Sequence, residues 1–151
     1  MPEIDINHLL WIVVGVQLSA ELGDRPLAYR IEQQLKDRLD KTLGPPAAGE
    51  LPKLAPAVIS DVYYLNSEEA QSRPVISIGG PGVNALSAQL VNDLPTVIAI
   101  EDKLVVQMDL EMADLRVAVW GMNHVETVKA VELFVDRGYL DAFVTGVLSQ
   151  S

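Results

Sequence analysis

Short apolar runs rich in β-branched residues recur along the chain and alternate with segments of helical periodicity. The run over residues 9–16 contains no charged residue, which is typical of a strand buried on both faces of a parallel sheet. Shorter runs of the same kind cover residues 75–78 and 116–120. We therefore predict that these three segments are neighbouring or near-neighbouring parallel strands of one central sheet.

A helix is predicted after each of these runs. The polar residues 19–25 predict a loop, and Pro26 then suits the first turn of a helix because it has no N–H to leave unpaired. Residues 83–94 and 125–135 carry apolar side chains at helical spacing. The apolar positions of the first helix repeat at every fourth residue: Leu27, Ile31, Leu35 and Leu39.

The remaining segments extend the same pattern. Residues 57–65 predict a further strand, and residues 96–100 with 104–108 predict either a hairpin or one long bulged strand. Residues 139–148 predict a short closing helix. The proline-rich and glycine-rich residues 42–56 predict a loop inside one domain, because the chain before them is too short to form a core alone.

Alternating strands and helices predict an α/β fold, a three-layer Rossmann-like domain with a mainly parallel central sheet. The 151 residues predict a single α/β domain over residues 1–151, since domains typically hold about 100–200 residues. The chain contains no cysteine. This excludes structural disulfides, thiol nucleophiles and cysteine-ligated zinc.

The formal net charge is −10, from 21 acidic and 11 basic residues. We expect no nucleic-acid partner, because polyanion binding needs a basic face and Asp37 and Asp40 interrupt the cluster of Lys36, Arg38 and Lys41. The longest apolar run near the start is far shorter than the roughly 20 residues that cross a bilayer, so we expect no membrane partner. The acidic start of the chain is opposite in charge to a secretion signal, so a cytoplasmic protein is expected.

The strongest candidate for a ligand site is the turn at Gly79, Gly80 and Gly82. From Gly80 the sequence fits G-x-G-x-x-A, ending at Ala85, between a predicted strand and a predicted helix. Such a turn is typical of dinucleotide-binding sites, where a phosphate approaches the backbone and the amides of the helix N-terminus. We also predict a positive φ at Gly80 or Gly82, because the chain reverses within four residues.

Asn84 begins the helix after this turn, and Glu101 ends a later strand, where an acid would bind ribose hydroxyls. Pro81 removes one amide from the turn, and too few residues follow Glu101 for a second nucleotide-binding half. We therefore expect an anion or nucleotide site without an NAD cofactor. A tight turn that needs glycine only for its backbone conformation explains the same residues and remains open.

A second candidate lies between the strand at residues 116–120 and its helix. Gly121, Asn123, His124 and Thr127 follow the strand, so they belong at the same sheet edge as the glycine turn. His124 is an acid–base or anion-contact candidate. The alternative is structural: Asn123 caps the helix in a capping box with Glu126, and His124 is solvated.

Acidic residues in two earlier segments complete the candidates. Asp24 and Arg25 follow the first strand, and Asp61 falls inside the predicted strand of residues 57–65. A buried Asp61 needs a partner, either a basic side chain or an amide, unless it is a catalytic carboxylate. No metal site is predicted, because His8 and His124 lie in distant segments.

Residues 75–84 resemble the I-G-G-P-x-x-N segment of Rossmann-like domains in archaeal S-layer proteins and the I-G-G segment of bacterial type 2 cell-wall-binding repeats. Residues 121–127, followed by Ala130, resemble the G-x-x-R-x-x-T-A region of those repeats, with His124 in place of the arginine. The resemblance covers residues 75–135. It implies a Rossmann-like domain that binds or assembles rather than catalyses.

We therefore expect a domain that binds a small anionic or nucleotide-like ligand. At a net charge of −10, attraction for an anion has to come from local dipoles, so the expected contacts are amides of residues 82–84 and 123–127. One alternative is a structural or assembly module without a small ligand, for which a homo-oligomer is compatible with the sequence. The other is a small hydrolase or transferase using Asp61, Glu101 or His124.

Overall fold

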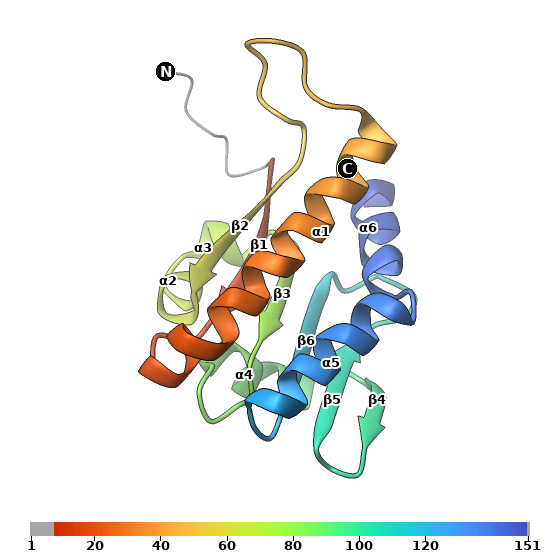
Figure 1. Cartoon of the computed structure of the whole chain (residues 1–151). Coiled ribbons are helices and arrows are strands. Elements are labelled where there is room, and N and C mark those ends of the chain that lie inside the picture. The colour runs from red at the N-terminus through yellow and green to blue at the C-terminus, as the bar shows by residue number, and fades with distance from the viewer. Residues whose placement is uncertain (1–7, 151) are drawn as a thin grey trace.

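The computed structural model describes residues 8–150 (Figure 1). The strands are β1 (Leu9–Val14), β2 (Ala55–Ser60), β3 (Val75–Ile78), β4 (Thr96–Ile100), β5 (Leu104–Met108) and β6 (Arg116–Gly121). The helices are the π-helix η2 (Ala20–Asp24), α1 (Arg25–Leu43), α2 (Asp61–Leu65), α3 (Glu68–Gln71), α4 (Ala85–Asp93), α5 (His124–Asp136) and α6 (Tyr139–Gln150). The acidic start of the chain, on which the expectation of a cytoplasmic protein rests, lies outside the described residues.

The strands form one sheet in the order β2-β1-β3-β6-β5-β4. β1 pairs in parallel with β2 and β3, and β3 pairs in parallel with β6. The prediction that β1, β3 and β6 are neighbouring parallel strands is therefore confirmed. β5 runs antiparallel to both β4 and β6. Of the two structures predicted for residues 96–100 and 104–108, a hairpin or one long bulged strand, the hairpin is therefore the one present.

Side chains that alternate along β1 enter two separate apolar clusters. Leu10, Ile12 and Val14 pack with α1, α5 and α6, which lie in front of the sheet in Figure 1. Trp11 and Val13 pack with buried residues of α2, α3 and α4 on the other face. The chain is thus an α/β protein with a mainly parallel sheet, and no helix of the described residues is long and apolar enough to cross a membrane.

The two strands that follow β1 in the sequence, β2 and β3, lie on opposite sides of β1 in the sheet. From β1 the chain crosses one face of the sheet through α1 to β2. It returns across the other face through α2 and α3 to β3, on the opposite side of β1. The carboxyl ends of β1 and β3 therefore flank a topological switch point, where open α/β sheets typically hold their ligands.

The prediction of a loop over residues 19–25 is wrong, because helical backbone begins at Leu18 and continues through η2 into α1. Pro26 therefore sits inside a continuous helical segment. Proline lacks an N–H, and its ring clashes with the carbonyl group four residues earlier, here that of Leu22. The chain accommodates this with a wider π turn, in which the Arg25 N–H donates to the Ala20 carbonyl.

The predicted strand over residues 57–65 is also wrong in its second half. β2 ends at Ser60, and α2 begins at Asp61. The Ser60 hydroxyl accepts a hydrogen bond from the Tyr63 N–H at 3.1 Å, which caps the new helix. Apolar periodicity alone missed this helix because its five residues are too few for a helical repeat to be recognised.

Candidate functional site

A cleft of about 430 Å³ opens at the carboxyl edge of the sheet, where three connections from strand to helix meet. Its lining comes from Ser19 and Asp24 after β1, from residues 80–83 after β3, and from residues 120–124 of β6 and its following turn. Thr127 of α5 completes it. Six predicted site residues therefore line one cleft, namely Gly80, Gly82, Gly121, Asn123, His124 and Thr127.

Two polar groups of the cleft lining have no hydrogen-bond partner among the described residues. One is the buried Nε1 of Trp120. The other is the carboxylate of Asp24, a residue that is 6% exposed. Burial raises its pKa from 3.8 to about 6, and the nearby charge of His124 acts in the opposite direction. Asp24 can therefore accept or release a proton close to neutral pH.

Two glycines make room for Asp24 and His124. A Cβ atom on Gly79 would collide with Oδ2 of Asp24, whose Cγ would lie only 3.2 Å away. A Cβ atom on Gly23 would come within 2.8 Å of Nδ1 of His124. The carboxyl group and the imidazole ring thus lie directly against glycine backbone.

The positive φ predicted for Gly80 or Gly82 occurs instead at Gly79, where φ is 108°. Neither Gly80 nor Gly82 has a positive φ, so that prediction is wrong. The reversal begins one residue earlier, directly after β3, because Gly79 still donates its N–H to Val119 of β6 at 3.1 Å. Gly79 is thus the glycine that the backbone requires.

Most amides at the start of α4 already have acceptors. The N–H groups of Val83 and Asn84 donate to the Gly80 carbonyl at 3.1 and 2.9 Å. The N–H groups of Leu86 and Ser87 donate to Oδ1 of Asn84. The expected contact of an anion with the amides of residues 82–84 therefore meets occupied donors at Val83 and Asn84.

Asn84 is buried and lies outside the cleft lining. Its Nδ2 donates to the carbonyl groups of Val13 and Ile78 at 3.2 and 2.9 Å, which joins the ends of β1 and β3. Asn84 therefore holds the glycine turn against the sheet and offers no polar atom to a ligand.

Asp61 is buried at the start of α2, and both carboxylate oxygens accept from amides. Oδ1 accepts from Val62 N and Oδ2 from Ala85 N, each at 2.8 Å. Of the alternatives left open for Asp61, the amide partner is the one present. These bonds occupy the carboxylate and also cover the first amide of α4.

The turn after β6 is held by its own side chains. Oδ1 of Asn123 accepts from the Glu126 N–H at 3.0 Å, which confirms the Asn123 half of the predicted capping box. The Glu126 carboxylate pairs with Nζ of Lys129 at 3.6 Å. Oγ1 of Thr127 accepts from the Gly121 N–H at 3.0 Å. His124 is the first residue of α5, and its imidazole ring borders the cleft opposite Asp24.

Glu101 does not join the other candidates. It lies in the exposed hairpin turn between β4 and β5, with a φ of 51°, and pairs with Nζ of Lys103 at 3.4 Å. β5 separates β4 from β6 in the sheet, and Glu101 does not line the cleft. The sequence spacing that suggested a ribose contact thus does not bring Glu101 to the glycine turn.

Asp24 and His124 are the titratable residues of the cleft lining. Glu21, on the same helical segment as Asp24, pairs with Arg25 at 3.0 Å. Within residues 8–150 no cluster of side chains is arranged to hold a metal ion. The arrangement supplies one hydrogen-bond acceptor at Asp24, one buried N–H donor at Trp120 and one imidazole at His124.

The sequence alone named Asp24 together with Arg25 as a candidate set after the first strand, gave Asp24 no role of its own, and did not single out Ser19. Their position in the sequence could have identified them, because both residues follow the carboxyl end of β1, where α/β proteins place ligand-binding residues. What the sequence could not supply was the π turn of η2, which ends at Asp24. π turns of this kind are frequent at functional sites.

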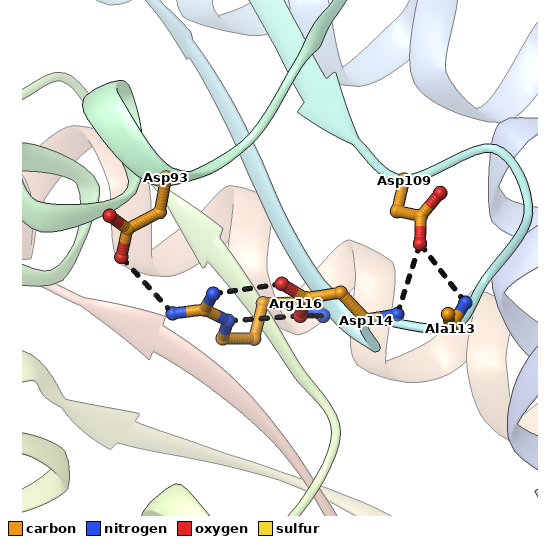
Figure 2. Close-up of polar contacts among 5 residues, drawn as sticks. All are labelled: Asp93, Asp109, Ala113, Asp114 and Arg116. Carbon is orange, nitrogen blue, oxygen red and sulfur yellow. Dashed lines mark hydrogen bonds and ion pairs between the residues drawn. The ribbon is translucent and has the colours of Figure 1, made fainter.

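Arg116 lies beside a second hollow, of about 460 Å³, near the amino-terminal ends of β3 and β6. Figure 2 shows its guanidinium group between two acids: Asp114 accepts two hydrogen bonds, at 2.9 and 2.8 Å, and Asp93 accepts one at 3.3 Å. Asp109 accepts from the N–H groups of Ala113 and Asp114. Arg116 lowers the pKa of Asp114, as expected of a structural ion pair.

Comparison of the chain with models of known protein families gave no match, and comparison with curated proteins found no significantly similar sequence.

Proposed function

We propose that the protein is a three-layer, Rossmann-like domain that binds a small molecule in the cleft at its topological switch point. The observation that carries this proposal is Asp24, a cleft residue that is 6% exposed and whose carboxylate receives no hydrogen bond from the described residues. Buried polar groups in folded proteins nearly always have a partner, and one without a partner calls for an explanation. A bound ligand that donates to Asp24 is that explanation.

The placement of Asp24 supports the same proposal. A buried acid with a strongly raised pKa in a cleft is typical of functional sites. Burial of the charged carboxylate destabilises the folded protein, and a residue with a purely structural role would have no reason to do this. The cleft also lies where α/β sheets commonly bind ligands. The resemblance of residues 75–135 to binding and assembly domains agrees with a binding role.

A second candidate is a small hydrolase or transferase, in which Asp24 and His124 act as an acid–base pair. The observation in its favour is the pKa of Asp24, about 6, because an efficient proton-transfer group titrates near the working pH. Neither Asp61 nor Glu101 supports this candidate, since Asp61 is bonded to two amides and Glu101 lies outside the cleft.

A third candidate is an assembly module. Leu18 and Leu22 of the first helical turns are each 72% exposed, Met122 in the turn before α5 is 70% exposed, and Val125 at the start of α5 is 62% exposed. These four side chains lie on the two segments that border the cleft. Exposed apolar side chains that gather on one part of a surface favour contact with another protein.

The test is a titration of ¹⁵N-labelled protein with adenosine, AMP, ribose 5-phosphate and a mixture of small amines and amides. We expect at least one compound to shift the amide signals of residues 80–83 and 121–127 together. The variant Gly82→Leu should abolish this response, because a Cβ at Gly82 meets no atom within 4 Å and a larger side chain can occupy the cleft. Ala48→Leu, in an exposed loop, is the matched control.

Shifts that stay outside these residues, or that persist unchanged in Gly82→Leu, would contradict the proposal. Self-association that disappears in Leu22→Gln, without any ligand response, would favour the assembly module. Sedimentation of the wild-type protein and of Leu22→Gln measures this.

A further inference from the structure

We infer that the ligand of the cleft presents an N–H or O–H donor to the Asp24 carboxylate and carries no negatively charged group, so that an amine, amidine or amide fits and a phosphate ester does not. This inference rests on the proposed function and specifies the ligand class of the same cleft. It replaces the anionic ligand that the glycine turn predicts.

The Asp24 carboxylate accepts and cannot donate once it is ionised. A Cβ atom on Gly79 would collide with Oδ2 of Asp24, so no protein side chain fits between the carboxylate and the Gly79 backbone. A ligand at this position therefore has to supply the donor.

A phosphate in a glycine-rich turn is held by free backbone amides at a helix N-terminus. At α4 the amides of Val83 and Asn84 are bonded to Gly80, and the amide of Ala85 is bonded to Asp61. The dipole of this helix is thus already capped by the carboxylate of Asp61.

A phosphate in the cleft would lie beside the ionised Asp24, and the one side chain of the lining that can carry a positive charge is His124, which already interacts with Asp24. Arg25 on the adjoining helix pairs with Glu21, and Lys129 on α5 pairs with Glu126. Among the described residues of the cleft lining and these two neighbours, no basic side chain is left over to offset a phosphate, whereas a cationic or neutral donor meets a favourable field.

Part of the remaining cleft wall is apolar, and Ser19, Asn123 and Thr127 add polar side chains to it. Pro81 and Val83 come from the glycine turn, and Trp120 and Met122 come from β6 and the turn after it. This wall suits the flat, apolar body of a small ring compound. Together with Asp24 it describes a ligand with a ring and a nitrogen-bearing donor group.

The experiment uses benzamidine, benzamide and benzoate, which share one ring and differ in the charge of the head group. Each is titrated at pH 7.5 into the ¹⁵N-labelled full chain, with inorganic phosphate and AMP as anionic probes. We expect benzamidine to shift the signals of residues 80–83 and 121–127 with a Kd at least tenfold below that of benzoate. Benzamide should fall between them, and phosphate should shift neither segment.

Asp24→Asn keeps the size of the side chain and removes its charge, so it should erase the preference for benzamidine over benzoate. Asp136→Asn, an exposed acid of α5, is the matched control and should keep the preference. Stronger binding of benzoate, phosphate or AMP to the wild-type cleft would overturn the inference and leave the proposed function standing. An unchanged preference in Asp24→Asn would do the same, whereas no response of the cleft to any probe would overturn both.

Discussion

At the scale of single residues, the cleft is arranged around the carboxyl group of Asp24, whose burial lowers the stability of the folded protein when the group is ionised. Asp24 lies against Gly79, and His124 lies against Gly23, so four residues from three connections fix the pair. A group of this kind lowers stability in its charged form and is retained where function needs it. Two predictions follow from its environment.

The free energy of unfolding should depend on the ionisation of Asp24. Its pKa is about 6 in the folded protein and about 3.8 when unfolded, so the folded state binds the proton more tightly. Stability contributed by the protonated form is complete below about pH 3.8 and is lost as pH rises through 6. Asp24→Asn should therefore match the wild type near pH 4 and exceed it by about 2–3 kcal/mol at pH 7.5.

Urea unfolding of both proteins at intervals between pH 4 and pH 8 measures this difference. His124→Gln provides a control of opposite sign, because His124 lowers the pKa of Asp24 and its removal should raise that pKa further. A stability difference that does not change with pH would show that Asp24 is ordinarily solvated.

The two glycines of the turn should respond differently to alanine. Gly79→Ala places a Cβ at a φ of 108° and against Asp24, and should destabilise the protein by about 1–3 kcal/mol. Gly82→Ala adds a Cβ in open space at an ordinary φ and should stay within about 0.5 kcal/mol of the wild type. Urea unfolding of both variants at pH 7.5 measures their free energies of unfolding. Equal decreases in the two variants would contradict the prediction.

At the scale of secondary-structure elements, the π turn of η2 determines which way Asp24 faces. Pro26 cannot donate to a carbonyl group in the preceding turn, and the chain responds with one wider turn before α1. One residue corresponds to about 100° of rotation around an α-helix, so the register of this turn decides whether residue 24 faces the cleft. A proline that resembles a simple helix start is thus part of the site.

Pro26→Ala should restore the missing N–H and allow the π turn to relax to α-helical register. Asp24 would then rotate away from the cleft, and its pKa should fall from about 6 toward its ordinary 3.8. The ¹³C chemical shift of its carboxyl group, followed from pH 3 to pH 8, measures this pKa directly. An unchanged pKa in Pro26→Ala would show that contacts other than Pro26 maintain the π turn.

At the scale of the whole molecule, stability should be distributed unevenly across the sheet. β1 and β3 lie in its interior with apolar cover on both faces, whereas β4 is an edge strand with several exposed residues. Opening of the β4–β5 hairpin removes fewer buried contacts than opening of the central strands. The cleft, which lies at the ends of β1, β3 and β6, therefore rests on the part of the sheet expected to be most stable.

Native-state hydrogen exchange should show this gradient. We expect the amides of β1 and β3 to exchange only on global unfolding, and those of β4 to exchange through local opening with a lower free energy. The hydrogen-bonded amides of β5 and β6 should fall between them. Equal protection across all strands would mean that the hairpin unfolds only together with the central sheet.

Local patterns in the sequence were sufficient for most of the scaffold. β-branched apolar runs determined the three central strands, and spacing by four residues determined α1, because these patterns reflect burial that holds along a whole element. Asn123 could be identified as a helix cap because its Oδ1 accepts from the amide of Glu126, only three residues away, which is within the reach of a local sequence pattern. The sequence also placed two of the three connections at one edge, since parallel strands end on the same side.

Only the tertiary structure decided what the candidate residues do. Asp61 lies 24 residues from the amide of Ala85 that it covers, so no local pattern reveals that the start of α4 is already occupied. The pKa of Asp24 depends on burial by segments that follow β1, β3 and β6, which are distant along the chain. Sequence periodicity records which side chains are apolar, whereas the availability of a donor or a carboxylate depends on which distant groups fill the space beside it.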